Sequence, residues 1–189
     1  MNLHKRQVAV LAFFSLLTLV GSNFAHATTV LYMPIPEMRS AAELIVRGTV
    51  TQSTSRWSIP QKQASTDITI NVSTVYKGNL KSGTFTFTQL GGTIGTFRQE
   101  ILGQPVFKTG EEILLFLRKN PHMQPNMQPW TVVGLSQGKF NLSPTKSDLA
   151  SRSLQGMSLT GKPGSTLPAD AHKEVFTVQE LVGSLPKGR

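Results

Sequence analysis

The sequence predicts a mainly β protein: a small Greek-key barrel of five or six strands, with a short helix before the first strand and another near the end. Two segments, 68–73 and 84–88, alternate apolar and polar residues with a period of two, which is typical of half-buried strands. Glycine-rich connections separate the apolar segments, and helical spacing is confined to 37–44 and 178–185. A β-sandwich is the competing arrangement.

The centre of the predicted fold is a long hairpin or meander. Ile68, Ile70 and Val72 alternate with polar residues in its first strand, and Phe85 and Phe87 alternate with threonines in its second. Two turn-forming groups, at 77–79 and 81–83, allow the chain to reverse between them.

Four other apolar segments are predicted strands, and the most hydrophobic of them should be buried on both faces because it does not alternate. That segment is 112–117; the others are 45–51, 130–135 and 139–142, and 29–33 is a short β-prone run that Pro34 and Pro36 end. The stretch 52–66 is polar, holds Pro60 and is predicted to be a loop.

Residues 1–27 have the pattern of a cleaved signal peptide. Lys5 and Arg6 precede the apolar run 8–20, and Ala25-His26-Ala27 fits the small-x-small cleavage rule. The run is shorter than the roughly 20 residues that span a bilayer, although an uncleaved anchor is the alternative. We therefore expect an exported protein, periplasmic or extracellular, that begins at Thr28 and keeps no stable membrane span.

Three regions are predicted after the signal peptide. Residues 28–142 form the barrel domain, 143–172 form a flexible polar segment rich in Ser, Thr, Gly and Pro, and 173–189 form an amphipathic helix and tail. Thr177 and Glu180 have the spacing of a capping box at the start of that helix.

Composition limits the chemistry that the chain can perform. It has no Cys, and residues 28–189 hold 17 basic and 10 acidic residues, since 1–27 contain two basic residues and no acidic one. The only histidines after residue 27 are His122 and His172, which lack a nearby nucleophile, so we predict no enzymatic activity and no cofactor. Whether His122, Met123 and Met127 bind a metal is left open.

Four segments together resemble an uncharacterised group of exported bacterial proteins: 42–50, 75–78, 110–117 and 133–139. Their spacing is also similar to the netrin-like domain of tissue inhibitors of metalloproteinases, which has an OB-fold. This resemblance covers roughly residues 42–142 and implies an OB-like barrel.

The resemblance also implies a protein partner, an exported metalloprotease. On this hypothesis the chain is a non-enzymatic binding or inhibitory module that acts through its free mature N-terminus, Thr28, Thr29, Val30 and Leu31. The chain departs from those inhibitors because they begin with a cysteine and are clamped by disulfides.

The alternative hypothesis is that a basic barrel face binds a polyanion, either polysaccharide or nucleic acid. Arg56, Trp57, Lys77 and Arg98 are the candidate residues, because single-stranded polymers stack on aromatic rings interleaved with cations. The sequence leaves open the identity of the partner, the barrel topology and the oligomeric state.

Overall fold

The structure, a computed structural model, describes residues 28–58, 63–81, 83–122 and 127–183. It is mainly β, with two short α-helices, as the sequence predicts. In chain order the elements are β1 (Thr28–Leu31), α2 (Ile35–Ala41), β2 (Leu44–Ser58), β3 (Gln63–Lys77), β4 (Gly83–Leu90), β5 (Gly92–Ile94), β6 (Phe97–Gln99), β7 (Glu112–Lys119), β8 (Trp130–Val132), the 3-10 helix η1 (Leu135–Gly138), β9 (Lys139–Leu142), β10 (Leu149–Ser151), β11 (Met157–Thr160), β12 (Val175–Thr177) and α3 (Val178–Val182). The predicted signal peptide, 1–27, lies outside the described residues.

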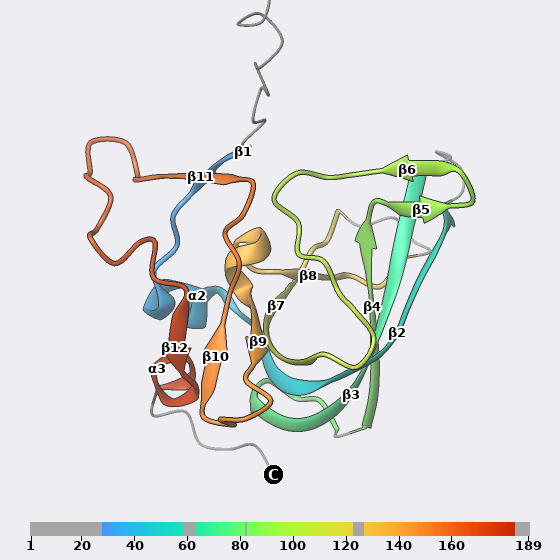
Figure 1. The fold of residues 1–189 in the computed structure, drawn as a ribbon, viewed down its shortest axis with the longest axis horizontal. Helices are drawn as coiled ribbons and strands as arrows, with labels where there is room; N and C mark the ends of the chain where they lie inside the picture. The colour runs from blue at the N-terminus through green and yellow to red at the C-terminus, as the bar shows by residue number, and fades with distance from the viewer. Residues whose placement is uncertain (1–27, 59–62, 82, 123–126, 184–189) are drawn as a thin grey trace, which may run out of the picture.

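One antiparallel sheet organises the molecule. Its eight strands have the order β12-β10-β9-β7-β2-β3-β4, with β8 also paired to β7, and Figure 1 shows β2 and β3 curving strongly around one end. The expected barrel is not closed: in the part of the chain that is described, no ladder joins β4 to the other end of the sheet. Side-chain hydrogen bonds connect β4 to other segments instead. Thr88 Oγ1 accepts from the Gln128 amide at 3.3 Å, and Gln89 Nε2 donates to Pro105 O at 3.0 Å.

Strand β7 is buried on both faces, which confirms the prediction from its unbroken apolar run. Ile113, Leu115 and Leu117 pack into a first core, formed with the curved strands β2, β3 and β4. Leu114 and Phe116 pack into a second core on the opposite face. The two cores therefore share one strand.

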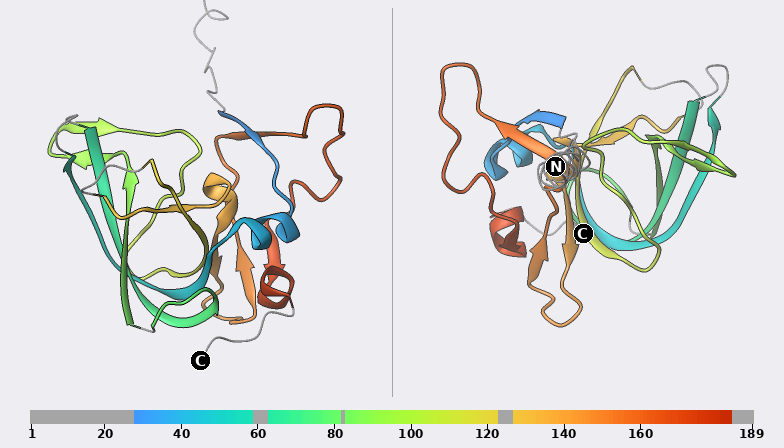
Figure 2. Two further views of the ribbon diagram at one scale, coloured as in Figure 1. Left: turned by 180° about the vertical axis from the view of Figure 1, so that it is seen from behind. Right: turned by 45° about the horizontal axis from the view of Figure 1, so that its top comes forward.

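The two cores have different partners. Within the curved half, Phe107 closes the first core from the side, with its ring edge-on to Phe87 at 5.5 Å between centroids. The second core contains Phe140 and Phe176, which also meet edge-on, and it is covered by α2 and α3. Figure 2 shows the two helices on the far side of β7 and β9 from the curved half.

Strands β2 and β3 are each 15 residues long and reach much farther than predicted. The predicted loop 52–66 was wrong for its described residues, 52–58 and 63–66, which pair as a continuous ladder. The cause is the composition of this part of the hairpin. Its residues are polar on both faces, so a strand there lacks the apolar–polar alternation on which the prediction depends.

The segment 143–172, predicted to be flexible, contains β10 and β11 in the structure. Strand β10 pairs with β9 and β12, and β11 pairs in parallel with β1. Arg152 is buried and donates to the carbonyl oxygens of Lys173 and Ala171, at 3.2 and 3.3 Å. These hydrogen bonds connect Arg152, in the first half of the segment, to the residues at its C-terminal end.

The C-terminal helix begins as predicted. Thr177 Oγ1 accepts from the Glu180 amide, and the Glu180 carboxylate accepts from the Thr177 amide, so the capping box is complete. The predicted stop at 186–188 lies outside the described residues. Neither α2 nor α3, the α-helices in the described ranges, has the length and apolar character needed to cross a membrane.

Because β7 belongs to both cores, truncating either face should destabilise the whole domain. We expect Leu114→Ala and Leu115→Ala each to lower the free energy of unfolding by about 2–5 kcal/mol, and each variant to keep a single urea transition. Urea unfolding monitored by far-UV circular dichroism and tryptophan fluorescence measures the free energy of unfolding and the number of transitions. Arg118→Ala, an exposed position on the same strand, is the control. A variant that loses one core in a separate, earlier transition would contradict the shared-strand arrangement.

Candidate functional site

The inner face of the curved sheet changes from apolar to polar along the β2–β3–β4 ladder. Ile68 and Phe87 pair across β3 and β4 and belong to the first core. Two residues farther along, the same face presents Thr66 paired with Gln89. Directly paired residues of an antiparallel ladder point to the same side of the sheet, so the apolar interior continues into a polar wall.

This wall borders a cleft of about 920 Å³. The other walls come from the β5–β6 hairpin with the segment that follows it, from η1 and β9, and from the turn at 153–156. The lining combines hydroxyl and amide side chains with apolar residues and glycines; six of the former are Ser53, Ser55, Thr66, Gln89, Gln104 and Asn141. Such side chains both donate and accept hydrogen bonds.

The segment 100–111, here called the crossing segment, spans the open side of the curved half (Figure 1). It has no regular secondary structure, but three side chains bind its carbonyl oxygens. Gln89 binds Pro105 O, Ser136 Oγ binds Gly103 O at 2.9 Å, and Lys139 Nζ binds Val106 O at 2.7 Å. These contacts fix the crossing segment beside the cleft, and a wall held in place lowers the entropic cost of binding.

The charges that line the cleft are largely compensated. Lys139 Nζ lies 2.8 Å from Glu111 Oε2, and Arg98 Nη2 lies 3.1 Å from Glu100 Oε2. Burial lowers the pKa of the Lys139 ammonium, although its ion pair with Glu111 opposes that shift. Lys108 is the remaining charged residue of the lining. The cleft thus carries little net charge.

Two residues of the cleft lining have spare acceptor capacity. Gln104 Oε1 and Asn141 Oδ1 are buried and receive no hydrogen bond from the described residues. Buried polar atoms are almost always satisfied in folded proteins, and each exception calls for an explanation.

The predicted N-terminal site, Thr28–Leu31, is strand β1 and is held on both edges. The Thr28 nitrogen donates to Gly156 O at 3.0 Å at the start of the pairing with β11. On the other edge, the buried amide of Gln137 donates to Leu31 O and accepts from the Met33 amide, both at 3.0 Å. Since Gly156 also lines the cleft, β1 borders its far end.

The four residues of the predicted basic face do not gather at one place. Lys77 lies at the opposite end of β3 from the partners of Arg56 and Trp57, and its ammonium donates to Arg39 O and Ser40 O at the end of α2. Trp57 instead meets Phe97 of β6, with 4.8 Å between ring centroids. Arg98, the next residue, lines the cleft. Phe97-Arg98 has the same aromatic–cation composition as Arg56-Trp57 in the sequence, but the contact between the two aromatic rings, 40 positions apart, is seen only in the structure.

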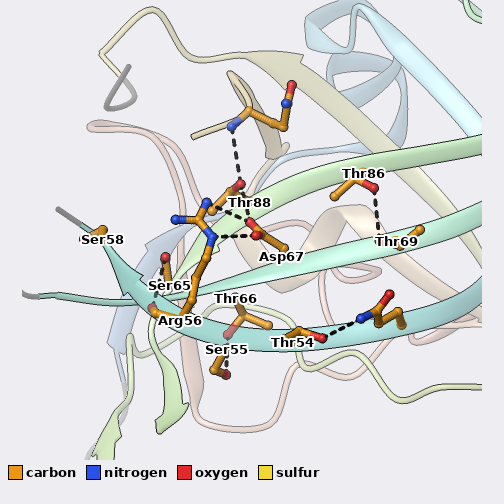
Figure 3. Close-up of polar contacts among 12 residues, drawn as sticks. Thr54, Ser55, Arg56, Ser58, Ser65, Thr66, Asp67, Thr69, Thr86 and Thr88 are labelled. Atoms are coloured by element: carbon orange, nitrogen blue, oxygen red, sulfur yellow. Dashed lines mark hydrogen bonds and ion pairs between the residues drawn. The ribbon is translucent and has the colours of Figure 1, made fainter. Parts of the chain in front are cut away.

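Arg56 lies on the outer face of the sheet, as Figure 3 shows. Its guanidinium donates twice to the Asp67 carboxylate, at 2.6 and 3.2 Å, and Thr88 Oγ1 donates to the same carboxylate at 2.7 Å. Burial raises the pKa of Asp67, but these hydrogen bonds outweigh it and hold the pKa below its usual range. This network joins β2, β3 and β4 outside the cleft.

The candidate metal residues are only partly described. His122 is exposed, Met127 is buried, and Met123 lies outside the described residues. In the part of the chain that the structure covers, no three His, Cys, Asp or Glu side chains come together as a set that could hold a metal ion.

Comparison of the chain with known protein families, with curated proteins and with solved structures finds no match. The function is therefore argued from the geometry of the cleft and its surroundings.

The Asp67 network should make stability depend on acid. A lowered pKa stabilises the fold above the unfolded value of about 4, and this contribution is lost as the pH falls through the folded pKa. We expect Asp67→Asn to be clearly less stable than the wild type at pH 6–7, with the difference shrinking below about pH 4. Urea unfolding across this range measures it, with Glu100→Gln as the control for removing one exposed charge. A difference that stays constant with pH would contradict the assignment.

Proposed function

We propose that this chain is an exported, non-enzymatic binding protein that takes a polysaccharide in the cleft. The observation that carries the proposal is the change of the sheet's inner face from apolar to hydroxyl- and amide-bearing side chains at a cleft of about 920 Å³. Export rests on the pattern of residues 1–27.

The chemistry of the lining favours a neutral, hydroxyl-rich ligand over a polyanion. Polyanion binding depends on cations that neutralise the charges of the polymer. Here Lys139 and Arg98 are each paired with a carboxylate. Serine, threonine, asparagine and glutamine can instead exchange hydrogen bonds with sugar hydroxyls in both directions.

The binding role is proposed as non-enzymatic because the carboxylates of the cleft have structural partners. Glu111 binds Lys139 Nζ and accepts from the Lys108 amide, and Glu100 binds Arg98. A general base must reach the proton that it abstracts. Because Glu111 and Glu100 each bind a cation, both carboxylates are poor candidates for a general base.

The geometry favours the cleft over the N-terminal segment as the binding site. For a free Thr28 amine to meet a protease metal, it would have to leave Gly156 O, and β1 would have to give up part of its pairing with β11. Breaking that pairing would cost free energy and would therefore weaken binding to the protease.

Filling the cleft should abolish binding without unfolding the protein. Ser53 is exposed and lines the cleft, whereas its neighbour Thr54 is equally exposed and points to the outer face. We expect Ser53→Trp to lower affinity for a neutral polysaccharide at least tenfold and Thr54→Trp to leave it unchanged. Isothermal titration of the mature chain against dextran, laminarin and galactomannan measures this.

Salt dependence separates the competing ligand classes in the same assay. Binding of a neutral polysaccharide should change little between 50 and 500 mM salt, because no counterions are released. Steep loss of binding with salt, together with binding to heparin, would support the polyanion alternative. No binding to any neutral polysaccharide would overturn the proposal.

A further inference from the structure

Two aromatic side chains lie exposed beside residues that line the cleft. Trp57 of β2 is 42% exposed and Phe97 of β6 is 44% exposed. Their ring centroids are 4.8 Å apart, and the rings are tilted by 42°. Large aromatic side chains usually bury most of their surface. This aromatic pair therefore leaves an unusual amount of ring surface in contact with solvent.

The aromatic pair continues the wall of the cleft. On β2, Ser53, Ser55 and Trp57 alternate in position and pair with Ile68, Thr66 and Ala64, so the three side chains share the inner face of the sheet. The first two line the cleft, and Trp57 follows about 7 Å beyond Ser55 at the strand rise of an antiparallel sheet. On β6, Gln99 lies two residues from Phe97 on the same face of the hairpin, and it lines the cleft as well.

The fold holds the β5–β6 hairpin in place by contacts other than the aromatic pair. The Thr93 amide donates to Ser55 Oγ at 3.2 Å, and the Ala64 amide donates to Gln99 Oε1 at 2.8 Å. The Gly91 amide donates to Ala64 O at 2.7 Å. These bonds fix the base of the hairpin, where Gly92 pairs with Gln99, whereas the Trp57–Phe97 contact lies nearer its tip.

We propose that Trp57 and Phe97 form a stacking subsite for a sugar ring at the end of the cleft. This inference rests on the proposed function and deepens it. A pyranose ring has an apolar face of C–H groups and a rim of hydroxyls. The exposed rings would cover the apolar face, while the neighbouring hydroxyl and amide side chains would bind the rim. A polysaccharide would then run from the aromatic pair into the cleft.

A nucleobase could also stack on such rings, but the surrounding charges favour the sugar. Single-stranded nucleic acids are held by cations that follow the phosphate backbone as well as by stacking. Next to the aromatic pair, Arg98 binds Glu100, and Arg56 binds Asp67 on the opposite face of the sheet. A phosphate backbone would have to break these ion pairs or pass an acidic group at Glu100.

Tryptophan fluorescence tests the subsite directly. The chain has two tryptophans, and the second, Trp130, packs against the first core. In a Trp130→Phe variant all tryptophan emission comes from Trp57. On titration with the neutral polysaccharide that binds best, we expect the emission of Trp57 to shift to shorter wavelength and to saturate with the calorimetric binding curve.

Matched substitutions measure the contribution of the rings. Trp57→Ala and Phe97→Ala should each weaken binding of that polysaccharide about five- to tenfold, and Trp57→Phe should retain most of it. Val175→Ala, which removes an exposed apolar group from β12 in the other half of the molecule, should have no effect. Circular dichroism confirms that each variant is folded.

The outcomes distinguish this inference from the proposed function. If polysaccharide binds and Ser53→Trp blocks it, but Trp57 emission stays constant and both alanine variants bind like the wild type, the subsite is wrong and the cleft proposal stands. If oligothymidylate shifts the Trp57 emission and the polysaccharides do not, the aromatic pair binds nucleobases and the sugar subsite is overturned. If no polysaccharide binds at all, both proposals fail.

Discussion

The burial of β7 on both faces is the constraint on which the rest of the structure depends. A strand with five successive buried apolar residues needs a layer on each side, because either face would otherwise meet water. The curved strands β2, β3 and β4 supply one layer, and α2, α3 and the β10–β12 pair supply the other. With no disulfide available, this shared strand joins the two cores.

The length of β7 also explains why a cleft exists. Its pairing with β2 ends at Thr49 and Glu112, whereas β2 continues to Ser58 beside β3. Beyond that point β2 pairs with β3 alone among the described residues, and the β5–β6 hairpin and the crossing segment face the inside of the curve instead of a further ladder strand. Phe107 of the crossing segment fills the part of this interior that belongs to the first core, and the remaining part is the cleft. Polar side chains on the inner face suit a surface that meets solvent.

Sequence reasoning succeeded where contrast between apolar and polar residues was strong. The run at 112–117, the alternation at 68–73 and the Thr177–Glu180 capping box all have local causes, and each is confirmed. The continuation of β2 through 52–58 and of β3 through 63–66 was missed because hydroxyl-bearing residues on both faces leave no periodicity. The meeting of Trp57 with Phe97 depends on where the β5–β6 hairpin docks, which is a tertiary property. The netrin-like resemblance stays a prediction.

The basic composition was the most conspicuous property of the sequence, yet several cations are used by the fold itself. Lys77 binds carbonyl oxygens at the end of α2, Arg152 binds those of 171 and 173, and Lys139 holds the crossing segment. Such groups add to net charge while most of their donors are engaged within the fold. The proposal of a neutral sugar polymer as the ligand rests on this use of the cations, together with the hydrogen-bonding groups and exposed rings near the cleft.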